Sequence, residues 1–294
     1  MEPVTARQLL AAQARVPTGC AAYDAALRGG VRRGQITELA GAAASGKTTL
    51  AMQLLVSAVA RPGSSAVYIG TEGAFRMDRF EELCEGRVDS LSAASARVSL
   101  QTVATADELA FAVHSLPAFV RSRVPPVRLV VVDSVAAPFR GDVDRGNAAR
   151  RAQELFGMSS RLRALAASAG LAVVTVNQVA AVFEDAVPKF SSGGGGGGGA
   201  KRQGSMQRSS LSLPRGAASE PLPYSVRPPV RAALGLAWSN CVNARVLLAH
   251  DAHAAMRCPG STGEGRAMHV LQSSDCAPAS AHAVLQSGGL HGPG

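Results

Sequence analysis

The sequence contains few aromatic side chains and almost no lysine. Aromatic residues make up 4% of its 294 residues and apolar residues 47%, so its core must be built mainly from small aliphatic side chains. Of 30 basic residues only Lys47, Lys189 and Lys201 are lysines, and the others are arginines. The net charge of +9 allows a nucleic-acid partner, although an arginine- and alanine-rich composition also follows from a GC-rich coding sequence.

The sequence also lacks the patterns of membrane and secreted proteins. No apolar run approaches the roughly 18 residues of a membrane-spanning helix, and the first residues do not resemble a signal peptide. The five cysteines show no C-x-x-C and no pairing pattern, which indicates reduced thiols in an intracellular protein. The cysteines and histidines near the C-terminus lack the spacing of a metal site. We therefore expect no membrane association and no metal held by these residues.

The strongest motif is a loop of the form G-x-x-x-x-G-K-T, from Gly41 to Thr48. It lies between a short apolar stretch and a helical pattern. At such a junction, backbone amides and the positive end of the helix dipole can hold a phosphate. Lys47 would place its charge on the β- and γ-phosphates of a nucleotide, and the Thr48 hydroxyl can bind Mg²⁺. The expected contacts come from Gly41, Ala42, Ala43, Ala44, Ser45, Gly46, Lys47, Thr48 and Thr49.

Three polar residues end other predicted strands. Asp133 closes the apolar run 129–132, where a carboxylate can hold Mg²⁺ through its water shell. Glu72 can orient a water molecule near the γ-phosphate, and the Gln178 amide can sense that phosphate. Each residue also has a structural alternative: a turn cap for Asp133, a surface acid for Glu72 and a buried polar contact for Gln178.

Alternating strand and helix patterns predict an α/β fold with a mostly parallel, twisted sheet and helices on both faces. The expected strands are 36–40, 66–69, 97–101, 127–132, 171–176, 245–250, 268–271 and 283–285. The expected helices are 5–15, 22–27, 48–60, 77–84, 105–120 and 147–169.

Residues 188–231 interrupt this alternation. They contain seven consecutive glycines, and their seven basic residues against the single acid Glu220 give a formal charge of +6. Such a composition buries too little apolar surface to order itself, so we expect a disordered insert. The predicted organisation is a short N-terminal segment, residues 1–15, followed by one nucleotide-binding core, residues 16–294, that carries the insert.

Four stretches follow the order of motifs in one protein family. They are Gly41–Thr48, YIGTEGAFR at 68–76, VVDSVAAPFR at 131–140 and VNQV at 176–179. Together they resemble the RecA/RadA recombinase family, whose members share a P-loop ATPase core. Residues 136–140 and 233–240 resemble one group of eukaryotic recombinase paralogues, in a plant- or alga-like version. The resemblance covers residues 16–292 apart from the insert.

The resemblance implies ATP and Mg²⁺ as cofactors and a role for each motif residue. Glu72 would activate the attacking water, with Lys47 as the second catalytic residue. Asp133 would support the Mg²⁺ that the loop threonine binds. Gln178 would link the nucleotide to a DNA-binding loop, and Arg79 would stack on the nucleotide base.

Two segments match the family's DNA loops, namely residues 140–151 and 179–231. Flexible arginine-rich loops suit single-stranded DNA, whose backbone needs charge without fixed geometry. The alternative is a solvated charged loop. The candidate DNA contacts in the first loop are Arg140, Arg145, Arg150 and Arg151.

The resemblance implies a nuclear accessory protein of homologous recombination and double-strand break repair. It would bind single-stranded DNA in an ATP-dependent way, with a second recombinase paralogue and the main recombinase as partners, and would hydrolyse ATP slowly. No phenylalanine precedes Phe75, so the Phe-x-x-Ala hook of filament-forming members is missing. Two alternatives stay open: an active DNA-dependent ATPase that catalyses strand exchange, and a scaffold that nucleotide merely stabilises.

Overall fold

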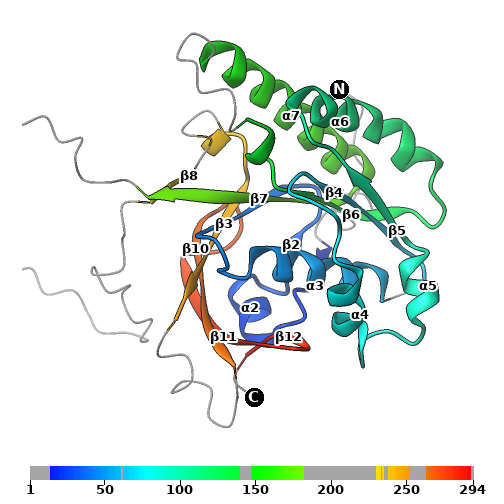
Figure 1. Ribbon diagram of the computed structural model, residues 1–294, viewed down its shortest axis with the longest axis vertical. Coiled ribbons are helices and arrows are strands. Elements are labelled where there is room, and N and C mark those ends of the chain that lie inside the picture. Colours follow the sequence, from blue (N-terminus) through cyan, green and yellow to red (C-terminus); the bar gives the residue numbers. More distant parts are fainter. Residues whose placement is uncertain are drawn as a thin grey trace, which may run out of the picture. The chain divides into compact units, whose positions relative to one another are not determined.

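The computed structural model contains a ten-stranded mixed sheet in the order β12-β11-β10-β9-β3-β7-β6-β4-β5, with β8 paired to β7 (Figure 1). The structure describes residues 14–60, 62–139, 148–181, 230–232, 234, 238–251 and 263–292. The strands of the sheet are β3 (Ile36–Gly41), β4 (Ser65–Gly70), β5 (Val98–Thr102), β6 (Val127–Asp133), β7 (Ala172–Ala181), β8 (Val230–Ala232), β9 (Ala244–His250), β10 (Glu264–Ser273), β11 (Ala279–Gln286) and β12 (Gly289–His291). A separate pair joins β1 (Arg15–Val16) to β2 (Val31–Arg32).

The centre of the sheet is parallel and one side is antiparallel. Strands β5, β4, β6, β7, β3 and β9 are joined by parallel pairings, whereas β9, β10, β11 and β12 are joined by antiparallel pairings. Parallel neighbours need crossover connections, which the helices supply here. The predicted α/β fold with a mostly parallel sheet is confirmed.

Helices cover both faces of this sheet. They are α2 (Ala21–Ala26), α3 (Lys47–Val59), α4 (Met77–Cys84), α5 (Leu91–Ser95), α6 (Ala106–Ser122) and α7 (Ala148–Ala169), together with a 3₁₀ turn η1 (Ala137–Phe139). In Figure 1, α3 and α4 lie on one face, and α6 and α7 on the other. Helix α6 begins with a capping box in which Thr105 and Glu108 each accept a backbone hydrogen bond.

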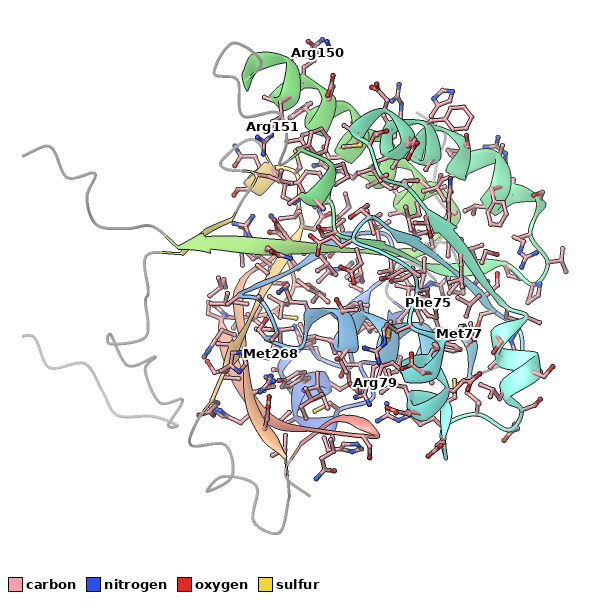
Figure 2. All side chains as sticks on the ribbon, in the orientation of Figure 1. Phe75, Met77, Arg79, Arg150, Arg151 and Met268 are labelled. Carbon is pink, nitrogen blue, oxygen red and sulfur yellow. The ribbon has the colours of Figure 1, made fainter. Side chains whose placement is uncertain are left out.

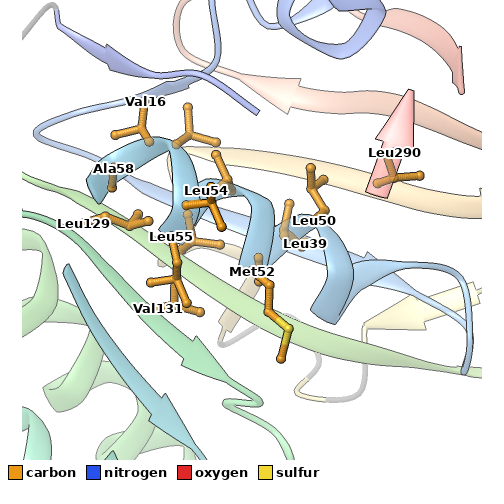
Figure 3. Close-up of a cluster of buried hydrophobic side chains, with 14 of the residues drawn as sticks. Val16, Leu39, Leu50, Met52, Leu54, Leu55, Ala58, Leu129, Val131 and Leu290 are labelled. Carbon is orange, nitrogen blue, oxygen red and sulfur yellow. The ribbon is translucent and has the colours of Figure 1, made fainter. Parts of the chain in front are cut away.

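Two apolar clusters hold the helices to the sheet. On one face Leu50, Leu54 and Leu55 of α3 are fully buried against strands β3 and β6 (Figure 3). On the other face α6 and α7 pack on the sheet around the buried Trp238. Each fully buried leucine contributes about 1.5–3 kcal/mol relative to exposure. The helix after the phosphate loop is therefore firmly anchored, which fixes the position of its first turn.

Most predicted elements are found within one or two residues of their expected bounds, but several boundaries were wrong. Strands β10 and β11 each begin four residues earlier than expected, at Glu264 and Ala279. Arg15 lies in β1, where it pairs with Arg32, and not at the end of a helix. Strand β7 continues to Ala181, because β8 pairs with it, so the predicted second DNA loop starts later. Helix α7 begins at Ala148, one residue from its expected start, so the predicted first DNA loop ended too late: Arg150 and Arg151 lie on the first turn of α7 and not in a loop.

Contacts within the chain define two units, Met1–Ala180 with Arg231–Gly294, and Ala181–Val230. Residues 182–229, which include most of the glycine-rich insert, lie outside the described residues, as do residues 1–13 of the N-terminal segment. The end of the predicted insert was placed too late, since Val230 and Arg231 belong to β8. The division into an N-terminal segment and one core stays a prediction.

Candidate nucleotide-binding site

The phosphate loop joins the end of β3 to the start of α3. Gly41 lies so close to β9 that a Cβ atom would approach the Leu248 carbonyl oxygen to 2.4 Å and Ser45 Oγ to 2.5 Å. Gly46 caps α3 in the left-handed region with φ +94°, which glycine adopts without strain. Both glycines are therefore required by the backbone path, and α3 begins at Lys47 with its amides facing the loop.

The other expected phosphate contacts line this loop. Ala42, Ala43 and Ala44 are exposed, while Ser45 is buried. The Lys47 ammonium donates to the Ala42 carbonyl oxygen at 2.5 Å and lies 3.5 Å from Ser45 Oγ. The loop thus encloses the lysine charge that a phosphate would meet.

The parallel strands bring the other predicted residues to the same edge of the sheet. In the strand register Gln178 lies beside Gly41, Gly70 beside Asp133 and Asp133 beside Val176. Carboxyl ends of parallel strands form the usual ligand-binding edge of such sheets.

Asp133 contacts the phosphate-loop helix directly. It accepts hydrogen bonds from the Thr48 hydroxyl and, at 3.2 Å, from the Tyr68 hydroxyl. Burial raises the pKa of the Asp133 carboxyl above its ordinary value of 3.8, and these hydrogen bonds and the charge of Lys47 oppose that rise. Burial, followed by the charge of Asp133, also raises the pKa of Tyr68. The two oxygen donors that the sequence predicts for Mg²⁺ therefore contact one another, and their role at the metal stays a prediction.

Glu72 lies between the ends of two other strands. Its carboxylate accepts hydrogen bonds from the Gln178 amide, at 3.2 and 3.0 Å, and from Ser134 Oγ at 3.3 Å. Thr71 fixes the backbone beside it, since its hydroxyl donates to the Ser134 carbonyl oxygen at 2.7 Å and accepts from the Ser134 amide at 2.8 Å. The candidate water-activating acid and the candidate γ-phosphate sensor thus touch one another.

Arg79 was expected to stack on the nucleotide base. It lies on α4, where it donates to Glu82 at 2.5 Å and to the carbonyl oxygens of Ser287 at 2.5 Å and Gln286 at 3.0 Å. Its α4 neighbour Phe80 packs against Phe75, whose ring centroid lies 5.6 Å from that of Phe80. Figure 2 labels Phe75 and Arg79. The structure ties Arg79 to the β11–β12 turn, and its expected role at the base stays a prediction.

The four candidate DNA contacts are only partly described. Arg140 and Arg145 lie outside the described residues. Arg150 is 72% exposed and pairs with Glu154 at 2.9 Å, and in Figure 2 it points away from α7. The Arg151 guanidinium lies 5.9 Å from the centre of the Phe139 ring.

Two contributors to the site carry no local sequence signal. Arg266 of β10 is 2% exposed and donates to the Ala44 carbonyl oxygen of the phosphate loop at 3.2 Å. Tyr68 holds Asp133 as described above. Arg266 is 222 residues from Ala44 in the sequence, so only the pairing of β10 with β9 brings them together.

A nucleotide and Mg²⁺ fit the residues at this site. The loop offers a cradle that a Cβ at Gly41 would fill, a lysine charge and the first amides of α3. Mg²⁺ usually takes one or two carboxylates together with phosphate oxygens and water, which matches Asp133 with Thr48. In the described part of the chain, no three His, Cys, Asp or Glu side chains form a separate metal cluster. Over the same residues, no helix has the length and apolar character needed to cross a bilayer.

Comparison with known proteins identifies the family of this chain. The sequence model of the Rad51 family matches residues 11–217, which include all four motif stretches. The predicted resemblance to RecA/RadA recombinases is thereby confirmed.

Curated relatives include the DNA repair protein XRCC3 of Bos taurus, 37% identical over 192 residues, which are 58% of this chain and 54% of that protein. DNA repair and recombination protein RadB of Halobacterium salinarum is 40% identical over 168 residues, 56% of this chain and 67% of RadB. The XRCC3 homologue of Arabidopsis thaliana is 29% identical over 254 residues, 81% of this chain and 76% of the homologue. The chain thus spans about half the length of the bovine protein.

Proposed function

This chain belongs to the Rad51 family, and we propose that it is an ATP-dependent DNA-binding accessory protein of homologous recombination and double-strand break repair. Rad51-family proteins bind nucleotides, and the relatives named above carry repair or recombination in their names. ATP with Mg²⁺ is the ligand that we propose for the loop from Gly41 to Thr48.

The observation that carries the proposal is the hydrogen bonding between Gln178 and Glu72. Gln178 lies three residues before the end of β7, and the predicted second DNA loop follows β7 in the sequence. The role proposed for Glu72 is to orient a water molecule toward the γ-phosphate, as a carboxylate at such a site can do. Binding or loss of the γ-phosphate can therefore alter the start of the DNA loop through the single contact between Glu72 and Gln178.

Each residue of the site has a proposed task. Lys47 holds the β- and γ-phosphates, and Thr48 and Asp133 hold Mg²⁺ with its waters. When bound, Mg²⁺ neutralises phosphate charge and so makes the γ-phosphate easier to attack. Glu72 orients and deprotonates the attacking water, and Gln178 responds to the presence of the γ-phosphate.

The DNA contacts are proposed on charge and position. Arg150 and Arg151 open α7, next in sequence to the segment that carries Arg140 and Arg145. Guanidinium groups at such a place suit the phosphates of single-stranded DNA. We further propose a second recombinase paralogue and the main recombinase as protein partners, and residence in the nucleus.

A second candidate function is an active DNA-dependent ATPase that catalyses strand exchange. It is favoured by the presence of both Lys47 and Glu72, since a protein that only binds nucleotide has no need of a water-orienting carboxylate. Rapid DNA-stimulated hydrolysis and filaments in electron micrographs would support this function over the accessory one.

The test is the affinity for a labelled single-stranded oligonucleotide, measured by fluorescence anisotropy with and without ATP and Mg²⁺. We expect ATP to tighten binding in the wild-type protein but not in Lys47→Ala. DNA affinity that does not respond to ATP, for the chain alone and with its paralogue partner, would remove the proposal.

A further inference from the structure

A buried carboxylate lies in the strand that leads into the phosphate loop. Glu38 of β3 is 0% exposed and lies three residues before Gly41. It accepts a hydrogen bond from Asn177 Nδ2 at 2.7 Å and pairs with the Arg245 guanidinium. The Arg245 side chain is 16% exposed, so Glu38 carries most of the cost of removing charge from water. That cost amounts to several kcal/mol for a buried ion, so such an ion pair is weak evidence of a stabilising role.

The partners of Glu38 come from the two strands that flank β3. In the strand register Glu38 lies beside Thr175 of β7 and beside Arg245 of β9. Arg245 also donates to Ser239 Oγ at 3.0 Å, in the short stretch that precedes β9. We name Glu38, Asn177, Ser239 and Arg245 the Glu38 cluster. This cluster ties the end of β7 and the approach to β9 to the phosphate-loop strand.

Side chains near the end of β7 make contacts on both faces of the sheet. Successive side chains of a strand point to opposite faces, so Asn177 turns to the Glu38 cluster while Gln178 turns to the other side. There the Gln178 amide reaches Glu72, and its backbone lies beside Gly41. The bond from Asn177 to Glu38 therefore fixes the piece of backbone from which Gln178 extends.

The polar groups in and around the Glu38 cluster are not arranged for maximum stability. Among the described residues, three buried polar atoms in or beside this cluster lack a hydrogen-bond partner: Thr175 Oγ1, Asn177 Oδ1 and Trp238 Nε1. Each such atom costs free energy, which an apolar layer of the same shape would avoid. A task other than stability accounts for keeping charged and polar groups here.

We propose that the Glu38–Arg245 ion pair, acting through Asn177, positions Gln178 against Glu72. We propose that the same ion pair couples nucleotide binding at the phosphate loop to the surroundings of Trp238. All four members of the Glu38 cluster are positioning residues, because they would act on the nucleotide site through Gln178 and its contact with Glu72. The proposal rests on the nucleotide site proposed above, and its readouts need no DNA.

Trp238 provides a specific probe. It is the single tryptophan of the sequence, it is fully buried, and it precedes Ser239 of the Glu38 cluster. Its fluorescence thus reports on the Glu38 cluster without labelling.

The experiment uses the full chain and two disruptive variants. The double variant Glu38→Met with Arg245→Met removes both charges together, a change that is often neutral for stability. Asn177→Leu cuts the connection to β7 and leaves the ion pair in place. Arg163→Met is the matched control, because Arg163 donates to the Cys241 carbonyl oxygen at 2.8 Å in the same stretch, whereas Glu38 bonds to Asn177 and Arg245.

Three quantities are measured: the Kd of a fluorescent ATP analogue, the rate of ATP hydrolysis and the change in Trp238 emission when nucleotide binds. We expect both disruptive variants to keep the analogue Kd within about threefold of wild type, a difference below 1 kcal/mol. Turnover should fall by about tenfold and the Trp238 response should disappear. Arg163→Met should keep all three.

Wild-type turnover together with a wild-type Trp238 response in a folded double variant or in Asn177→Leu would overturn the proposal. If the double variant does not fold, Asn177→Leu decides the question alone. If the wild-type chain binds the analogue but hydrolyses nothing, the hydrolytic role of Glu72 fails and the Trp238 response still tests the Glu38 cluster. A wild-type chain that binds the analogue without any change at Trp238 would overturn the proposal as well.

Discussion

The side-chain amide of Gln178 donates to both carboxylate oxygens of Glu72, at 3.2 and 3.0 Å, across the ends of two strands that are not adjacent in the sheet. Strand β6 lies between them, and its last residue, Asp133, contacts Thr48. Two side-chain contacts, Gln178 with Glu72 and Asp133 with Thr48, thus lie at the edge of the sheet that carries the phosphate loop.

Asp133→Asn should make the nucleotide-free protein more stable and its Mg²⁺-dependent nucleotide binding weaker. Because burial raises the pKa of this carboxyl, folding favours its protonated form. Asp133 therefore contributes stability below its ordinary pKa of 3.8, and that contribution is lost as the pH rises through the raised value. At neutral pH the charge costs stability, and the neutral amide should raise Tm by about 2–4 °C for each kcal/mol gained.

Thermal unfolding without nucleotide, and nucleotide titrations with Mg²⁺ and with EDTA, check this prediction. Because a protonated carboxyl binds Mg²⁺ poorly, the raised pKa of Asp133 also predicts that the affinity of the wild type for Mg²⁺-nucleotide weakens as the pH falls toward that pKa. A lower Tm in Asp133→Asn, with Mg²⁺ dependence intact, would contradict it.

Arg266→Lys should weaken nucleotide binding by about tenfold, or 1.4 kcal/mol. The buried guanidinium holds the Ala44 carbonyl oxygen at 3.2 Å, and Ala44 has a left-handed backbone with φ +58° that a non-glycine residue adopts only under strain. Lysine lacks the planar fork that reaches this carbonyl oxygen while also bonding to Glu264. Calorimetric titration with an ATP analogue measures the loss.

Glu264→Gln is the control for this prediction. Glu264 pairs with Arg266, but its side chain is 74% exposed, so its loss should leave nucleotide affinity unchanged. Equal effects of the two substitutions would show that Arg266 acts through its ion pair and not through the phosphate loop.

Gly41→Ala should destabilise the protein by about 1–3 kcal/mol and abolish nucleotide binding. The new methyl group would meet the Leu248 carbonyl oxygen at 2.4 Å, a distance that only movement of the loop or of β9 can relieve. Gly63→Ala is the matched control, because nothing lies within 4 Å of a Cβ there. Urea unfolding and analogue binding measure both effects, and a tolerated Gly41→Ala would mean that the loop path is not as tight as described.

Arg150→Ala and Arg151→Ala should each reduce the affinity for single-stranded DNA and lower the salt dependence of binding. Each lost phosphate contact should reduce the slope of log K against log salt by about 0.7 for a single strand. Arg161→Ala, an exposed arginine farther along α7, is the control. An unchanged slope in both N-terminal variants, or an equal loss in Arg161→Ala, would remove these residues from the DNA interface.

Much of the site could be predicted from the sequence because its parts lie at strand ends. An apolar run that ends in a carboxylate, as at Asp133, is readable locally, and parallel strands bring such ends to one edge. The contact between Glu72 and Gln178 follows from that geometry, although no local signal specifies their hydrogen bonds.

The remaining contacts depend on strand pairing over long sequence separations. Arg245 meets Glu38 only because β9 pairs with β3, and Arg266 reaches Ala44 only because β10 pairs with β9. Local patterns indicate a strand but not its neighbour or its register. The same limit explains Arg15, whose helical sequence pattern is overridden by pairing with Arg32.

The most direct test of the central claim is ATP hydrolysis by the pure protein, with and without single-stranded DNA, in wild type and Glu72→Gln. We predict slow turnover that DNA stimulates and that Glu72→Gln reduces by about 10²–10⁴-fold while ATP still binds. Glu85→Gln, at the exposed end of α4, should behave as wild type. Turnover that Glu72→Gln leaves unchanged would contradict the assignment of this site and, with it, the proposed link from nucleotide to DNA.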